Sequence, residues 1–249
     1  MTASDAATAG ASRRRDPVQT VFLGSGAFAR PILDTLAGHP AIHLAGVVTA
    51  PPRPVGRRGI ITPTPVELAA RERGMAVLAP TRLRDPASVE AVLALEPDLV
   101  VLADYGQIVP PALLDRPHGA LNLHPSLLPR HRGATPIPAA ILAGDGETGV
   151  TLMRMDAGLD TGPIVAVERT PLRGDETAPE LEVLLAALAA DLLARSLDGW
   201  LAGALPARPQ PPTGATMTRP LRRADGRLDP ARPAADLERQ VRAHLPWPG

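Results

Sequence analysis

Short apolar runs alternate with segments of helical spacing along the first half of the chain. Buried strands are predicted by apolar and β-branched runs at 18–23, 43–49, 76–78, 99–103 and 120–124. Amphipathic helices are predicted between them at 28–36, 66–73 and 86–95. Strands that alternate with helices of about ten residues indicate parallel βαβ units. The pattern therefore predicts an α/β fold with a Rossmann-like, doubly wound and mostly parallel sheet.

The second half of the chain contains fewer strands and one long helix. Helices are predicted at 136–143 and 181–197, and strands at 150–153 and 164–168. Residues 206–220 are rich in proline, which is typical of a linker. A last helix is predicted at 234–244, with Leu237, Val241 and Leu245 on its apolar side.

The composition excludes several classes of function. The 26 basic and 26 acidic residues cancel, which argues against a chain that binds nucleic acid only through net charge. Cysteine is absent, so disulfides, cysteine nucleophiles and thiolate metal sites are excluded. Every basic residue is Arg, which excludes a Schiff-base lysine and a P-loop lysine. The few aromatic residues disfavour a groove built on base stacking.

A glycine-rich turn follows the first predicted strand. Residues 24–29, GSGAFA, match the GxGxxA pattern of dinucleotide-binding folds. Such a site also needs an acidic residue about twenty positions later to hold the ribose, and none lies between Asp34 and Glu67. We therefore favour a tight strand-to-helix turn over a nicotinamide site.

An arginine-rich segment follows the second predicted strand. In a doubly wound sheet, ligands bind at the carboxyl ends of the strands, so residues 50–65 lie beside the expected site. This segment is predicted to be a long, flexible loop that carries Arg53, Arg57 and Arg58 and no acidic residue. It suits contact with phosphate or an RNA backbone, and the alternative is a solvated loop.

Polar residues also end the strand predicted at 120–124. Asn122 and His124 are two residues apart, so their side chains share one face of the strand. An amide donor beside an imidazole can stabilise an oxyanion and move a proton. Asp156 or Asp160 could orient His124, although Asp and Gly are also common in turns for backbone reasons.

Two other chemistries use some of the same residues. Ser126 could be a nucleophile activated by His124, but no GxSxG elbow is present. His124, His131 and Asp160 could hold a metal ion, but no HExxH or comparable spacing supports this.

The motifs LNLHPSLLPRHRGATPI and ETGVTLMRMDAGLDTGPI resemble the 10-formyltetrahydrofolate-dependent formyltransferase family, and the resemblance extends over residues 18–249. It implies the formyltransferase fold, with Asn122, His124 and Asp160 as catalytic residues. It implies 10-formyltetrahydrofolate as formyl donor and no metal. The folate-binding residues that it implies are Tyr105, Gly106, Gln107, Ile108, Ser126, Leu127, Leu128 and Pro129.

The acceptor implied by the resemblance is initiator methionyl-tRNA, whose formylation serves translation initiation. Arg53, Arg57 and Arg58 correspond to the family's loop that approaches the tRNA acceptor stem. One alternative is a formyltransferase acting on a nucleotide-linked amino sugar. Another is a truncated remnant that binds folate without turning it over.

The resemblance also suggests how the chain is organised. We expect a disordered tail at 1–16, a catalytic domain at 17–205, and a linker with a terminal helix at 206–249, without the family's C-terminal domain. A cytoplasmic monomer that does not contact membranes is expected. Ser12-Arg13-Arg14 only faintly resembles a twin-arginine export signal, because the apolar stretch after it is short and broken by glycine.

The expected mechanism is attack of the acceptor's primary amine on the formyl carbon. Asn122 and a protonated His124 would donate hydrogen bonds to the developing oxyanion. Asp160 would keep His124 charged and oriented.

Overall fold

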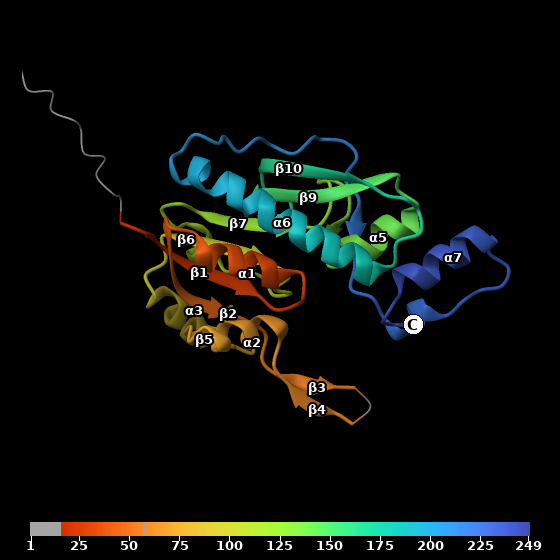
Figure 1. Cartoon of the computed structure of the whole chain (residues 1–249), viewed down its shortest axis with the longest axis horizontal. Coiled ribbons are helices and arrows are strands. Elements are labelled where there is room, and N and C mark those ends of the chain that lie inside the picture. Colours follow the sequence, from red (N-terminus) through yellow and green to blue (C-terminus); the bar gives the residue numbers. More distant parts are fainter. Residues whose placement is uncertain (1–15, 57) are drawn as a thin grey trace, which may run out of the picture.

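A seven-stranded central sheet organises the molecule (Figure 1). The computed structural model describes residues 16–56 and 58–249, so residues 1–15 of the predicted tail lie outside the described part. The strand order is β10-β9-β7-β6-β1-β2-β5. The bounds are β1 Val18–Gly24, β2 Ile42–Val48, β5 Val77–Leu78, β6 Leu99–Ala103, β7 Ala120–His124, β9 Glu147–Arg154 and β10 Ile164–Pro171. The pairs from β5 to β7 are parallel, and β9 alone runs in the opposite direction, antiparallel to both β7 and β10. The predicted mostly parallel α/β fold is therefore confirmed.

Helices cover the sheet on both faces and extend beyond it at one end (Figure 1). Their bounds are α1 Ala29–Gly38, α2 Pro65–Glu72, α3 Pro86–Leu93, α4 Pro111–Leu114, α5 Pro136–Ala143, α6 Ala178–Leu201 and α7 Ala234–Ala243, with a 3-10 turn η1 at Arg223–Gly226. Helix α6 begins three residues earlier than predicted. Its start is stabilised by Glu180, whose carboxylate accepts the Thr177 N–H at 2.9 Å.

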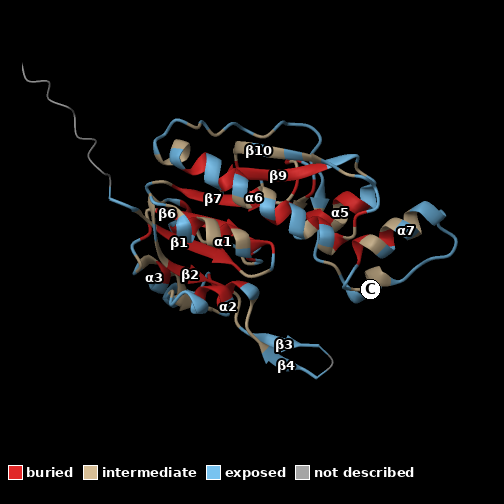
Figure 2. Cartoon of the chain, in the orientation of Figure 1, coloured by how far each residue is buried: buried red, intermediate tan, exposed pale blue. Residues whose placement is uncertain are grey.

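The core is divided by the sheet. Within β1, Phe22 packs with the cluster that includes α1 and α6, whereas Val21 and Leu23 pack with the cluster on the opposite face. A strand buried on both faces needs apolar residues at consecutive positions, which explains the unbroken apolar run in β1. Figure 2 shows the buried strands in red at the centre of the molecule. The sheet therefore gives a rigid base to the loops at its carboxyl edge.

The arginine-rich segment is a hairpin and not the predicted flexible loop. β3 (Arg53–Val55) and β4 (Ile60–Thr62) pair antiparallel and project from the body, largely exposed (Figures 1 and 2). β-branched residues favour extended backbone in both short strands. At the base of the hairpin, the Thr49 and Thr64 hydroxyls lie 2.6 Å apart and share a hydrogen bond.

The proline-rich segment 206–220 packs back onto the rest of the molecule, although its composition predicted a linker. Arg208 and Ile164 exchange both backbone hydrogen bonds, at 2.7 and 2.8 Å. Further along, β11 (Met217–Thr218) pairs parallel with β8 (Arg132–Gly133). Proline removes N–H donors from this segment, but the residues between the prolines still bond to neighbouring loops. The proposed domain boundary at residue 205 stays a prediction.

Helix α7 is present, but its predicted apolar side is wrong. Val241 is 50% exposed and Leu245 is 41% exposed, whereas Gln240 and Ala243 are buried. The side chain of Gln240 faces inward because its amide donates to the carbonyl oxygens of Asp225 and Arg227, at 2.9 and 3.1 Å. Within residues 16–56 and 58–249, no helix is both long enough and apolar enough to span a membrane.

Candidate active site

Three predicted catalytic side chains meet at the carboxyl edge of the sheet. β7 carries Asn122 and His124, which are 5% and 4% exposed, and the loop between β9 and β10 carries Asp160. The Asn122 amide Nδ2 donates to Asp160 Oδ1 at 3.3 Å. His124 Nδ1 lies 3.7 Å from Asp160 Oδ2. The structure thus brings together an amide, an imidazole and a carboxylate.

Asp156, the other carboxylate considered as a partner of His124, forms its hydrogen bonds within its own loop. One of its oxygens accepts from the Gly158 N–H at 3.0 Å and from the Thr161 hydroxyl at 2.7 Å. These are turn interactions, so the structure favours Asp160 over Asp156 as the neighbour of His124.

Asp160 is held from several sides in an unusual backbone conformation. Its φ of +52° lies in the left-handed region, which residues with side chains seldom adopt. The Gly133 N–H donates to Asp160 Oδ2 at 2.7 Å. Nearby, Gly162 must lack a side chain, because a Cβ there would lie 1.9 Å from the carbonyl oxygen of Arg154. Such constraints keep a strained loop in place at a functional site.

Gln210 is a supporting residue that the sequence did not indicate. Its amide nitrogen donates to the carbonyl oxygens of Asp160 and Gly162, both at 2.8 Å. Its amide oxygen accepts from Arg132 Nε and Nη2 at 3.0 and 2.6 Å. Beside Gln210, a cavity of about 400 Å³ is lined by Arg132, Thr161 and the prolines of the segment. Because residues 206–220 have the proline-rich composition of a linker, the sequence carries no signal that Gln210 supports the loop at Asp160.

The environment of His124 favours the neutral imidazole. Burial lowers the pKa of His124 below its ordinary value of 6.5, and this outweighs the opposing effects of Asp160 and of the hydrogen bond to His131. His124 Nε2 lies 2.9 Å from the carbonyl oxygen of His131. A carbonyl can only accept, so Nε2 carries the proton and Nδ1 is left with a lone pair. The protonated His124 expected from the sequence is therefore corrected.

The serine-nucleophile and metal alternatives find no geometric support. Ser126 is fully buried, and its hydroxyl donates to the carbonyl oxygen of Arg130 at 2.7 Å. Its hydroxyl is thus engaged with the loop and is not bonded to His124. In the part of the chain that the structure describes, no three His, Asp or Glu side chains are grouped so that they could hold a metal ion.

The predicted folate-binding residues follow two neighbouring strands, β6 and β7. After β7, Leu128 donates its N–H to the Thr151 hydroxyl at 3.1 Å, which ties this loop to β9. After β6, Tyr105 is 3% exposed within the core, and the Gln107 amide oxygen accepts the Leu83 N–H at 2.8 Å. Ile108, in contrast, is 78% exposed. The folate role of these residues stays a prediction.

The glycine-rich turn is filled by carboxylates of the chain itself. A Cβ on Gly26 would lie 1.8 Å from Asp104 Oδ2, so this glycine makes room for the Asp104 carboxylate. At the start of α1, Glu182 Oε1 accepts the Phe28 N–H at 3.2 Å. A dinucleotide would place its pyrophosphate at such a helix start, where these two acidic groups would repel it. This supports the interpretation of GSGAFA as a tight turn.

Two of the three predicted RNA-binding arginines lie on the hairpin. Arg53 and Arg58 are exposed, and Arg57 lies outside the described residues. The hairpin follows β2, and its base is fixed to the glycine-rich turn, because the Ala50 N–H donates to Ser25 Oγ at 3.0 Å. The hairpin therefore leaves the body at the same edge of the sheet as the catalytic candidates.

An α/β sheet whose carboxyl edge carries an amide donor, a neutral imidazole and a carboxylate suits an enzyme of acyl-group transfer, which must stabilise an oxyanion and move a proton. Residues 18–197 match the formyl transferase family. The chain belongs to this family.

Relatives and solved structures agree with this assignment. The chain is 46% identical to a methionyl-tRNA formyltransferase of Roseiflexus sp. (strain RS-1), over 94% of this chain and 72% of the relative. It is 49% identical to one of Halorhodospira halophila, over 92% of this chain and 74% of the relative. Its fold is similar to that of an N-formyltransferase of Helicobacter canadensis solved with folinic acid and dTDP-3-aminofucose, with a TM-score of 0.69 and 17% identity, covering 91% of this chain and 80% of that one.

Proposed function

We propose that this enzyme transfers the formyl group of 10-formyltetrahydrofolate to the amino group of initiator methionyl-tRNA, for translation initiation. The observation that carries the proposal is the high identity to methionyl-tRNA formyltransferases over most of the chain. The grouping of Asn122, His124 and Asp160 at one edge of the sheet supports it, because formyl transfer needs these functional groups together.

In the proposed reaction, the acceptor amine attacks the formyl carbon and the formyl oxygen becomes an oxyanion. Asn122 donates a hydrogen bond to this oxygen, using an N–H of its amide. Nδ1 of the neutral His124 takes the proton that leaves the amine. Asp160 stabilises the resulting imidazolium across the 3.7 Å separation. The bond from carbon to N10 of the folate then breaks, and His124 returns the proton to N10.

The proposed role of the hairpin is to hold the tRNA. Arg53 and Arg58 are exposed at the edge of the sheet where the chemistry takes place, and phosphates of an acceptor stem would pair with them. All three catalytic candidates come from one chain, so the enzyme is proposed to act as a monomer. Translation initiation places the reaction in the cytoplasm.

The amino-sugar alternative has weaker support. Its strongest basis is the likeness to sugar N-formyltransferases, and at 17% identity this likeness concerns the fold alone. Asp104, after β6, and Glu182, on α6, also lie at the start of α1, where they would repel the diphosphate of a nucleotide sugar.

The test is an assay with 10-formyltetrahydrofolate and charged initiator methionyl-tRNA that follows tetrahydrofolate release and acid-stable formyl-methionine together. Equal amounts of both products are expected. A dTDP-linked amino sugar is offered in a parallel reaction. Formylation of the sugar and not of the tRNA would overturn the proposal. Folate binding without release of either product would favour the non-catalytic remnant.

A further inference from the structure

His131 is a buried imidazole that the proposed reaction does not use. It is 7% exposed, and its carbonyl oxygen accepts the Nε2–H of His124 at 2.9 Å. Its own ring bonds to Asp145, with 2.7 Å between His131 Nε2 and Asp145 Oδ2. A carboxylate, an imidazole and a backbone carbonyl thus lie in sequence behind His124.

The backbone at His131 needs support to keep its carbonyl in this place. Its φ is +56°, in the left-handed region, which is uncommon for a residue with a side chain and persists only when the surroundings hold it. On one side, the His131 N–H donates to the Thr216 hydroxyl at 2.8 Å. On the other side, the ring is bonded to Asp145. The direction of the carbonyl therefore depends on the side chain of His131.

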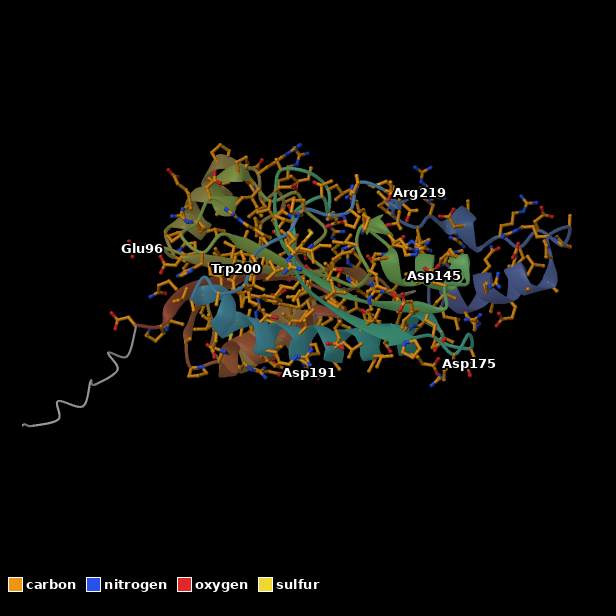
Figure 3. The ribbon with its side chains drawn as sticks, turned by 90° about the horizontal axis from the view of Figure 1, so that it is seen from above. Glu96, Asp145, Asp175, Asp191, Trp200 and Arg219 are labelled. Atoms are coloured by element: carbon orange, nitrogen blue, oxygen red, sulfur yellow. The ribbon has the colours of Figure 1, made fainter. Side chains whose placement is uncertain are left out.

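Asp145 is itself fixed by the end of helix α5. Gly144 ends the helix with a φ of +64°, and the Asp145 N–H donates to the carbonyl oxygen of Ala140 at 3.1 Å. Figure 3 shows Asp145 at this helix. A carboxylate is unfavourable at a helix C-terminus, so it needs cationic or donor partners. Arg130 pairs with Oδ1 and His131 with Oδ2, which satisfies both oxygens.

We infer that His131 and Asp145 are positioning residues, which keep His124 in its Nε2–H tautomer and leave Nδ1 free to accept the substrate proton. The inference rests on the proposed function for its catalytic consequence, but the tautomer is a property of the free protein. Among the described residues, Asp160 and His131 are the titratable groups that act on His124. Asp145 faces His131, and Arg130 pairs with Asp145. The electrostatic effect of His131 lowers the pKa of His124 and so helps to keep it neutral.

The tautomer is tested by nitrogen NMR of histidine-labelled protein without substrates. The His124 signals are assigned by their loss in His124→Gln. In the wild type at neutral pH, Nε2 is expected to carry the proton and Nδ1 to be bare. An Nδ1–H tautomer in the wild type would overturn the inference, even if the protein formylates tRNA. A correct tautomer with no activity would instead count against the proposed function alone.

Three variants then test the positioning. Asp145→Ala removes the partner of the His131 ring, Asp145→Asn keeps an oxygen that can accept from it, and Glu147→Ala removes an exposed carboxylate two residues away as a control. Asp145→Ala is expected to populate both His124 tautomers and to lower kcat roughly 10- to 100-fold with little change in KM. Asp145→Asn should recover most of the rate, and Glu147→Ala should behave as the wild type.

His131→Asn supplies a second route if Asp145→Ala fails to fold, because Asn tolerates the left-handed backbone. It removes the ring whose electrostatic effect lowers the pKa of His124, so the acid limb of the pH–rate profile should move to higher pH. Equal losses of rate in Asp145→Asn and Asp145→Ala, with the wild-type tautomer and pH profile in both, would show a merely structural role and overturn the inference.

Discussion

The sheet edge that carries Asn122 and His124 and the β3–β4 hairpin lie at the same end of the strands but differ in how they are held. Asn122 and His124 are almost fully buried and bonded to groups from two separate loops, at Asp160 and at His131. On the hairpin, Ile61 is 63% exposed, and both described arginines face solvent. Transfer chemistry benefits from fixed donors in a low dielectric, whereas a large charged acceptor must be met at an exposed surface. The comparison predicts that changes at the edge alter kcat and that changes on the hairpin alter KM.

The largest effect is expected at the buried edge, from Asn122→Ala. Loss of the amide donor to the formyl oxyanion should lower kcat about 10²- to 10³-fold, because such a donor acts mainly in the transition state. Steady-state kinetics with both substrates measure this, and KM for the folate should change little. A variant with wild-type kcat would show that Asn122 is not the oxyanion donor. It would also contradict the expectation that changes at the buried edge lower kcat.

The pH dependence of kcat/KM tests the role of His124 at the buried edge. The neutral His124 is the proposed base and its pKa is lowered below 6.5, so its contribution to kcat/KM should be constant above that value and fall as pH drops below the lowered pKa. The fall should approach tenfold per pH unit well below the pKa. Since the acceptor amine also titrates, the ratio of wild-type to His124→Gln rates isolates the histidine. A ratio that rises on acidification would mean that the imidazolium is the active form.

The same lowered pKa has a consequence for stability. The unfolded chain binds a proton at His124 more readily than the folded protein does, so acidification through 6.5 and below favours unfolding. His124→Gln should remove this part of the acid sensitivity, which chemical denaturation at several pH values would reveal.

The smallest effect is expected on the hairpin. The double variant Arg53→Ala and Arg58→Ala should raise KM for methionyl-tRNA roughly 3- to 10-fold and make it less sensitive to salt, since each lost phosphate contact lowers the salt slope by about one. The value of kcat should stay near that of the wild type. Arg195→Ala, an exposed arginine on α6 paired with Glu168, is the matched control. A fall in kcat with unchanged KM would contradict the expectation that the hairpin contributes to tRNA binding and the buried edge to the chemical step.

The local pattern of hydrophobic residues was enough to predict most of the strands and helices of the fold. The strands β6 and β7 lie where the sequence predicts, at 99–103 and 120–124. β6 is buried and apolar throughout, whereas in β7 Asn122 and His124 alternate with apolar residues. β9 and β10 extend beyond their predicted bounds, since each continues to pair past its apolar centre. Pairing between strands depends on the partner, which a single segment does not encode.

The sequence was least informative for segments whose composition is polar or rich in proline. Residues 206–220 have the composition of a linker, but Gln210, Thr216 and Thr218 bond to loops distant in sequence. In α7, the hydrophobic pattern points to Val241, while two backbone carbonyls draw Gln240 inward. Hydrogen-bond partners of this kind arise only when the chain has folded, so hydropathy misplaces the buried side.

The sequence by itself determined the sheet, the order of its strands along the chain, and the shared direction of Asn122 and His124, because a spacing of two on a strand fixes a common face. Tertiary structure decided which carboxylate reaches them, since Asp160 is 38 residues from Asn122 and Asp156 turns into its own loop. It also decided the state of His124, because burial lowers its pKa and the His131 carbonyl sets its tautomer. Both depend on distances across the fold, which the order of residues along the chain leaves open.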